Sequence, residues 1–567
     1  METHHWISIN KKGATMKKSS VKKAIVILVM SLIVPMLLMG CSQKSESLRI
    51  GTSFSIVGGS PWSPFVNIGQ NGLHQLIYDS LFVIDEHGFP IPGIVNDYEQ
   101  KQLNYNLTIR EGVLFHDGTE LTAADVADTL LRLIKLHGNS NREAIKRFSK
   151  LEKIEVLGKY QLQFQLKEPD MFFLNTLTFG ITPAYNPEHK EVKQWPVSFS
   201  TSGRELVFSL LSDDPEMNKV IDETYTRNQL IGSGPWKVLE KSLQIYNSTN
   251  SPVTFDLVVN KDYWKGAAKI ENITFKKVET SRDSMNGHLL GKSIDLASPG
   301  PLHLSDLDRM QYYEKFKNAE HLTLVPYILD YPTQVIVFHD LDNSMTTEKV
   351  RKAIAYAINK EELIKVQNGF DGSNGQIANQ YIKPNNEWYY GVDEPYEYNP
   401  EESKRLLREA GYTESISLKV RGFVVDDANW AQNPVANELV RQLKEVGIEV
   451  NWRPINSTEE FDFSFDLGIC SSPNHFYEGM LSPERSYHPL YNDNTVFARA
   501  VEDMMRSTDL EIQKQKYHEA LQELHDQAAV IPLIFEYYYY AYNNRIQGLE
   551  LTNPNQIFVN LGQATLK

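Results

Sequence analysis

Hydrophobic and polar residues follow two different periods along this chain, and the period changes several times. Tyr105 to Arg110 and Leu162 to Leu166 alternate apolar with polar side chains, which predicts strands with one buried face. Leu48 to Thr52 is typical of an earlier strand. Thr122, with Asp125 three residues later and an apolar run behind it, predicts the start of a helix. The alternation of the two periods indicates an α/β or α+β chain.

Helix signals dominate the second half. Thr347 precedes apolar residues spaced three and four apart, which predicts an amphipathic helix. Asn399 and Pro400 form a cap and a proline at the first helical position, and Gly411 is expected to end that helix. Two further helices are predicted over residues 436–446 and 510–528.

The first forty residues have the pattern of a secretion signal. Six lysines between residues 11 and 23 precede the apolar run 24–39, and Gly40 stands directly before Cys41. The run is shorter than the roughly 20 residues that a membrane span needs. Leu38 to Cys41 resembles a bacterial lipobox, which implies cleavage after residue 40 and a lipid on Cys41. An uncleaved anchor is the alternative, and both place the rest of the chain outside the cytoplasm.

Charge and cysteine content exclude several classes of protein. The net charge of −15 becomes −20 without residues 1–40, which carry six lysines and one glutamate. The sequence shows no stripe of clustered basic residues, so a nucleic-acid partner is not expected. Cys41 and Cys470 are the two cysteines, and they predict neither a disulfide framework nor a metal site. Residues 41–48 are expected to form a tether.

Seven short phrases occur in a fixed order between residues 48 and 550. The most specific runs from Leu107 to Gly118 and continues to Val126. The series comprises 76–82, 107–126, 232–236, 260–266, Gly291 with Asp295, 350–353 and 406–412. Together they resemble the family-5 bacterial extracellular solute-binding proteins, a group of oligopeptide-, dipeptide- and nickel-binding proteins.

The resemblance implies a two-lobed α/β fold of the periplasmic-binding-protein type, with an extra sub-domain and a ligand cleft between the lobes. It places lobe I at 49–325 with the sub-domain at about 98–230, lobe II at 326–535, and a return to lobe I at 536–567. The crossings are expected near 323–329 and 531–540. Closure around a ligand would be a hinge motion.

The same resemblance implies a function without catalysis or cofactor. The protein would be a monomer, anchored by its lipid to the outer face of the cell membrane. It would capture a small solute, most simply an oligo- or dipeptide, and deliver it to the permease subunits of an ABC importer. A ligand sensor built on the same fold remains an alternative, because sequence does not separate sensing from transport.

The resemblance places the ligand contacts in the cleft between the lobes, and aromatic side chains commonly line such clefts, which adds Trp62, Tyr331 and Trp430 to the candidates. In peptide-binding members a lobe II strand ends in an aspartate that holds the peptide amino group, and residues 463–469 match that strand. The familiar Asp-Tyr-Pro-Asp ending is replaced by 470–475, and an early Asp-Pro is replaced by 60–64. The expected contacts are Trp62, Tyr331, Gln334, Trp430, Asp466, Ser471, Asn474 and His475.

His475 leaves a second ligand class open. Imidazole suits nickel and zinc, so His475 could contact a metal chelate in place of a peptide. No metal site made by the protein itself is expected. His116 and Asp117 resemble a catalytic or metal-binding pair, but the Asp-Gly that follows is turn chemistry.

An enzyme is the main rival class, and the sequence lacks its signatures. His518-Glu519 is followed by Ala520, Leu521 and Gln522, so the second histidine of a zinc-protease motif is missing. The 232–236 phrase lacks the Gly-Lys-Ser/Thr ending of a phosphate loop. A DNA-binding regulator would need an N-terminal helix-turn-helix, which the secretion signal displaces.

Overall fold

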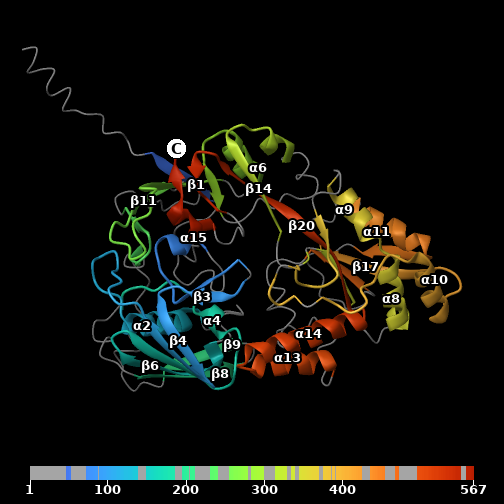
Figure 1. The fold of residues 1–567 in the computed structure, drawn as a ribbon, viewed down its shortest axis with the longest axis horizontal. Helices are drawn as coiled ribbons and strands as arrows, with labels where there is room; N and C mark the ends of the chain where they lie inside the picture. The colour runs from blue at the N-terminus through green and yellow to red at the C-terminus, as the bar shows by residue number, and fades with distance from the viewer. Residues whose placement is uncertain are drawn as a thin grey trace, which may run out of the picture. The chain divides into compact units, whose positions relative to one another are not determined.

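We describe the protein from a computed structural model (Figure 1). The structure describes residues 46–52, 72–86, 88–137, 148–184, 194–202, 205–210, 230–239, 254–278, 282–298, 313–328, 332, 334–338, 344–368, 375–384, 386–389, 391–423, 434–453, 467–471, 495–550 and 557–567. Residues 48–567 form one unit of contacts. None of the helices in these ranges has the length and hydrophobicity that crossing a membrane requires.

The predicted first strand is the fourth strand of a five-stranded sheet. Its order is β10-β11-β12-β1-β13, and β1 (Ser47–Thr52) runs parallel to β13 (Leu296–Ser298). The other strands are β10 (Trp236–Val238), β11 (Thr254–Val259) and β12 (Asn272–Lys277). Leu48 and Ile50 are fully buried in the core beneath this sheet, which explains the alternation seen in the sequence.

A six-stranded antiparallel sheet carries the two other predicted strands. Its order is β4-β5-β7-β6-β8-β9, with β5 at Asn104–Ile109 and β7 at Gln161–Leu166. Tyr105 and Phe164 are buried register partners on the face that packs against α2 (Ala123–His137). The remaining strands are β4 (Val95–Lys101), β6 (Leu151–Gly158), β8 (Gln194–Ser202) and β9 (Glu205–Leu210).

A seven-stranded sheet organises the second half of the chain. Its order is β14-β20-β15-β19-β17-β18, and β16 also pairs with β20. The strands are β14 (Leu322–Ile328), β15 (Gln334–Val337), β16 (Gly375–Ile377), β17 (Ile416–Phe423), β18 (Ile448–Arg453), β19 (Leu467–Ser471) and β20 (Val530–Asn543).

Strand β20 pairs with three other strands along its length, and Ile534 to Glu536 are the residues that pair with β16. Val530 to Ile534 pair with β15, and Tyr537 to Asn543 pair with β14. Tyr540 and Tyr542 are buried in the core of the five-stranded sheet. These tyrosines of β20 therefore contribute to that core.

Helices gather beside β17 and β18 in the second half (Figure 1). They are α8 (Glu348–Ala357), α9 (Lys360–Asn368), α10 (Pro400–Glu409) and α11 (Pro434–Glu445). The Asn399 side chain accepts the Glu402 N–H at 3.0 Å, and Gly411 has a φ of 96°, so both predicted signals of α10 are confirmed. That left-handed φ is the reason for a glycine there.

A helical hairpin follows, formed by α13 (Val496–Arg506) and α14 (Leu510–Asp526). The prediction of a helix from residue 510 is confirmed, and its end differs by two residues because Gln527 acts as the C-cap. The smaller elements are η1 (Leu73–Leu76), β2 (Phe82–Ile84), β3 (Pro90–Pro92), η2 (Phe148–Lys150), α4 (Phe173–Thr176), α6 (Arg282–Leu290), η6 (Ser344–Thr346), β21 (Ile546–Gln547), α15 (Ile557–Asn560), η9 (Leu561–Gln563) and β22 (Thr565–Leu566).

Candidate functional site

Two of the predicted ligand contacts face each other in the seven-stranded sheet. Gln334 is the first residue of β15 and Ser471 is the last residue of β19, and they are direct register partners in this antiparallel pair. The strand predicted at 463–469 therefore overlaps β19, which extends two residues further. The other predicted residues lie outside the described part of the chain: Cys41, Trp62, Tyr331, Trp430, Asp466, Asn474 and His475.

The sheet topology brings together the ends of the described strands that adjoin several of these positions in the sequence. Strands β17 and β19 are parallel, with Phe423 opposite Cys470. Their carboxyl ends therefore lie side by side, along the edge of the sheet that is formed by strand ends and not by an outer strand. The chain leaves that edge toward Trp430 from β17, and toward Asn474 and His475 from β19. It enters β15 at the same edge. Ligands of α/β proteins bind at the carboxyl ends of parallel strands, so this edge is the candidate site.

The five-stranded sheet repeats this arrangement in the first half of the chain. Strands β1 and β13 are parallel, and Thr52 and Ser298 are register partners at their carboxyl ends. The segment that leaves β1 contains Trp62, which lies outside the described residues. Trp62 therefore follows the carboxyl end of a parallel strand, as Trp430 and His475 do.

A buried carboxylate joins three of the sequence phrases, and sequence reasoning did not find it. Asp79 accepts hydrogen bonds from Ser233 Oγ at 2.9 Å, Tyr263 OH at 3.0 Å and Trp264 Nε1 at 3.0 Å. Burial raises the pKa of Asp79, and Lys265 opposes that shift. These donors come from the 232–236 and 260–266 phrases, so the phrases are fixed by one another and serve the fold.

The histidine of the Phe-His-Asp-Gly phrase is also structural. His116 Nε2 lies 3.0 Å from the Gly234 carbonyl oxygen, and the Gly232 N–H donates to its Nδ1 at 3.4 Å. Asp117 accepts from the Thr119 N–H and hydroxyl within the turn, and Gly118 has a φ of 86°. The predicted turn is confirmed. His116 uses both ring nitrogens within the protein, which fixes its neutral tautomer.

We expect His116 to make the free energy of unfolding depend on pH. Burial lowers its pKa from 6.5 to about 4, so between these values the unfolded chain binds more protons. Its stabilisation is present above pH 6.5 and is lost as the pH falls toward 4. The loss is at most about 3 kcal/mol, at 1.36 kcal/mol per pKa unit. We would measure the free energy of unfolding with urea from pH 4 to 7. It should rise less steeply with pH for His116→Gln than for the wild type.

A second histidine provides the control for that measurement. His74 in η1 is fully buried, and desolvation lowers its pKa to about 4, partly offset by a backbone bond to Thr178. His116→Gln should remove only part of the pH dependence, because His74 continues to titrate. An unchanged slope would contradict the assignment of the pH dependence to His116.

A lysine in the second half has an unusual environment. Lys360 Nζ is buried and donates to the Ala378 carbonyl at 2.8 Å and to Asn379 Oδ1 at 3.1 Å. Burial lowers its pKa to about 7. Perturbed pKa values are a signal of functional groups. Here, however, both acceptors belong to the segment after β16, and Lys360 holds that segment in place. The contacts therefore favour a structural role.

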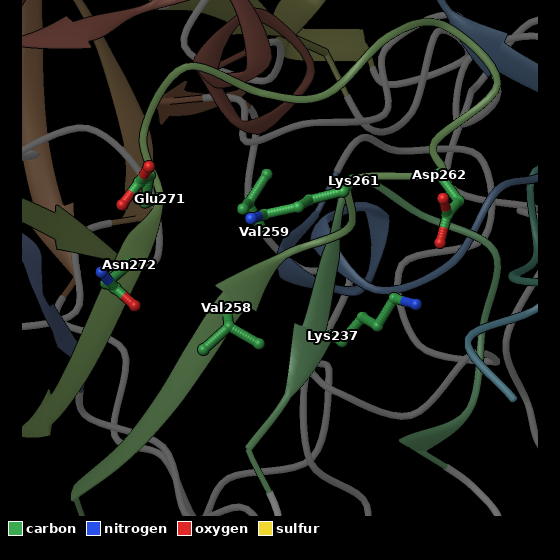
Figure 2. Close-up of a pocket in the computed structure, with 7 residues that line it drawn as sticks. All are labelled: Lys237, Val258, Val259, Lys261, Asp262, Glu271 and Asn272. Carbon is green, nitrogen blue, oxygen red and sulfur yellow. The ribbon is translucent and has the colours of Figure 1, made fainter.

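A pocket of about 420 Å³ lies on the five-stranded sheet, away from the edge just described (Figure 2). Lys237, Lys261, Asp262 and Glu271 give its lining two charges of each sign. Neither Gln334 nor Ser471, the predicted contacts within the described residues, lines it. It is a surface hollow with balanced charge, and we do not assign the ligand site to it.

Comparison with known sequences identifies relatives. Residues 90–495 match the model of the bacterial extracellular solute-binding proteins, family 5 Middle. The oligopeptide-binding protein AppA of Bacillus subtilis is 24% identical over 398 residues, which cover 67% of this chain and 62% of AppA. The glutathione-binding protein GsiB of Salmonella typhimurium is 24% identical over 380 residues, covering 66% of this chain and 63% of GsiB. The matches thus span less than two thirds of these relatives.

Solved structures show the same fold across 92% of this chain. CtaP from Listeria monocytogenes has a TM-score of 0.67 at 20% identity, with 99% of its chain covered. NikZ from Campylobacter jejuni, in complex with Ni(L-His), has a TM-score of 0.63 at 18% identity, with 99% covered. AppA from Bacillus subtilis, in complex with a nonapeptide, has a TM-score of 0.58 at 20% identity, with 99% covered. These likenesses confirm the predicted two-lobed α/β fold.

Proposed function

The chain belongs to the bacterial extracellular solute-binding proteins of family 5, and on that premise we propose that it captures a peptide for an ABC importer. The observation that carries the proposal is the sheet edge where β17 and β19 end and β15 begins. Tyr331 precedes β15 in the sequence, Trp430 follows β17 and His475 follows β19, which supports a ligand site near these strand ends. Such an edge suits a ligand held between segments of different strands.

The names of the relatives favour a peptide. AppA is an oligopeptide-binding protein and GsiB is a glutathione-binding protein, so both bind chains of amino acids. A peptide offers main-chain donors and acceptors, which a binding site can pair without regard to the peptide's sequence. Hydrated pockets then accept varied side chains. Asp466, directly before β19, is our candidate for holding the peptide amino group.

Capture requires two lobes and an anchor. We assign residues 49–325 and 536–567 to lobe I, with a sub-domain at about 98–230, and residues 326–535 to lobe II. Strands β14 and β20 would then be the hinge. Cys41 would carry the lipid that holds the protein as a monomer at the outer face of the membrane, beside the permease. Binding and delivery involve no catalytic step.

A metal chelate is the second candidate ligand. His475 motivates it, and the likeness to NikZ, solved with Ni(L-His), gives it structural precedent. Within the described residues no group of three or more histidine, cysteine, aspartate or glutamate side chains could hold a metal ion. In this second proposal the chelate would bring its own ligands, and His475 would add one contact.

The test is to identify what the protein binds when it is purified. We would isolate residues 42–567 gently, and compare native mass spectra with spectra of the material released on denaturation. We expect a ladder of peptide masses. A single metal-containing small molecule would instead support the chelate and contradict the peptide. If the protein is empty, a thermal-shift screen should show that peptides raise the melting temperature and that nickel with histidine does not.

A further inference from the structure

A small apolar contact joins residues that lie on opposite sides of the proposed hinge. The ring of Phe89 stacks on the ring of Trp388, with centroids 5.4 Å apart and planes 15° apart. Met171 and Phe172 pack in the same cluster as Trp388. Phe89, Met171 and Phe172 belong to the first half of the chain, and Trp388 belongs to the second.

Two neighbouring phenylalanines are buried in different cores. Phe173 is fully buried beneath the six-stranded sheet, 5.0 Å from the ring of Tyr105 and 5.6 Å from that of Phe164. Phe172 is 7% exposed, and it packs instead with Trp388 and residues of α13 and α14. A side chain inserted into the core of another lobe indicates more than a passing surface contact.

The residues from the first half are held rigidly before they meet Trp388. Asp85 Oδ1 accepts the Phe89 N–H at 2.8 Å, and the Asp85 N–H donates to the Phe89 carbonyl at 2.8 Å. Asp170 Oδ1 accepts the Phe172 N–H at 3.0 Å. Asn175 Nδ2 donates to the Gly88 carbonyl at 3.1 Å and joins the two turns. The apolar knob is thus preorganised, which lowers the entropy lost on docking.

The receiving surface is also fixed. Trp388 is 3% exposed, and its backbone N–H donates to Asn386 Oδ1 at 2.9 Å. Its ring packs edge-to-face on the ring of Tyr517 in α14, with the ring centroids 5.5 Å apart. An indole clamped between Phe89 and Tyr517 has the stacked and edge-to-face geometries that aromatic pairs favour. Separating the two halves would expose Phe172 and one face of Trp388 to water.

We propose that Phe89, Met171 and Phe172 form a latch on Trp388 that holds the two lobes together before a ligand binds. The proposal rests on the proposed function, because it gives the lobes an open and a closed state. A ligand shifts such an equilibrium only by its difference in affinity for the two states. The latch supplies part of the free energy of closure and so raises the fraction of ligand-free protein in the closed state. The apparent Kd for a ligand that prefers the closed state falls in proportion to that rise.

The test uses ligand-free protein, prepared by unfolding, dialysis and refolding. Phe172→Ala and Phe89→Ala should each increase the radius of gyration measured by small-angle X-ray scattering. Each should also speed hydrogen exchange of the amides at 386–389 by about tenfold, which corresponds to about 1.4 kcal/mol in the open–closed equilibrium. Tyr398→Ala is the matched control, since Tyr398 is 45% exposed and lies outside the contact.

Two variants are used so that the latch can still be tested if one of them does not fold. Phe89 is half-buried, so Phe89→Ala should keep the fold even if Phe172→Ala does not, as circular dichroism would show. Wild-type scattering and exchange in a folded Phe89→Ala protein would overturn the latch. Because neither measurement uses a ligand, a protein that binds no peptide would still give a clear answer about the latch.

Discussion

Replacing Asp295 with alanine is expected to lower the free energy of unfolding by about 3–5 kcal/mol, the usual cost of breaking a buried ion pair. Asp295 is fully buried, and its carboxylate accepts from the Arg49 backbone N–H at 2.9 Å and from Arg49 Nε at 3.0 Å. It also lies 3.3 Å from Arg545 Nε. The variant would leave two arginines facing each other across an empty carboxylate position.

Denaturation by urea, followed by circular dichroism, measures this loss. The matched control is Glu99→Ala, which breaks the ion pair with Lys101 on the outer strand β4. Both side chains of that pair are more than half exposed, so the control should cost no more than about 1 kcal/mol. Equal losses in the two variants would contradict the role of Asp295 as the buried partner of Arg49 and Arg545.

Gly232→Ala is expected to have the second large effect, a loss of about 3 kcal/mol or more. An added Cβ would lie 2.1 Å from the Ile77 carbonyl oxygen and 2.6 Å from Tyr78 Cδ1. The backbone cannot move aside easily. The His116 N–H donates to the Gly232 carbonyl at 2.7 Å, and the Gly234 N–H donates to the Ile77 carbonyl at 2.8 Å. The close approach of two backbones therefore requires glycine at this position.

Gly287→Ala is the matched control, and its expected sign is opposite. Gly287 lies inside α6, is exposed, and would place an added Cβ in open space. Alanine in a helix interior is more favourable than glycine by about 1 kcal/mol, so the control should be stabilised. Thermal unfolding of the two variants measures both changes. A Gly232→Ala protein as stable as Gly287→Ala would contradict the steric argument.

Local signals in the sequence predicted the elements better than their mutual contacts. The cap at Asn399 and the left-handed Gly411 depend on residues close in sequence, so α10 was predictable. Helix α13 has the same kind of signal, with buried Phe497, Ala500, Val501 and Met504 three and four apart, yet it was not among the predicted helices. Asp79 could not be assigned from sequence, because its donors are more than 150 residues away.

The candidate site was predictable only in part, for a topological reason. The resemblance supplied Gln334 and Ser471 as separate candidates, and neither residue type carries a recognisable signature alone. Their pairing depends on the antiparallel register of β15 and β19, which joins segments over 130 residues apart. The parallel pair β17–β19 sets the edge from which the segments with Trp430 and His475 depart. Sequence indicates Gln334 and Ser471 one at a time, whereas the sheet makes them register partners.

Strand β20 pairs with β15, β16 and β14 in turn, and this limits how the protein can be divided for expression. A fragment ending at residue 535 would stop in the middle of this strand, before Glu536 meets Gly375 and before Tyr537 to Asn543 meet β14. A complementary fragment without residues 326–535 would keep only Leu322 to Val325 of β14, paired with Tyr540 to Asn543, and would leave Tyr537 to Tyr539 without their partners on β14. Recombinant halves cut at these positions should therefore be poorly soluble separately, and the chain is better produced whole.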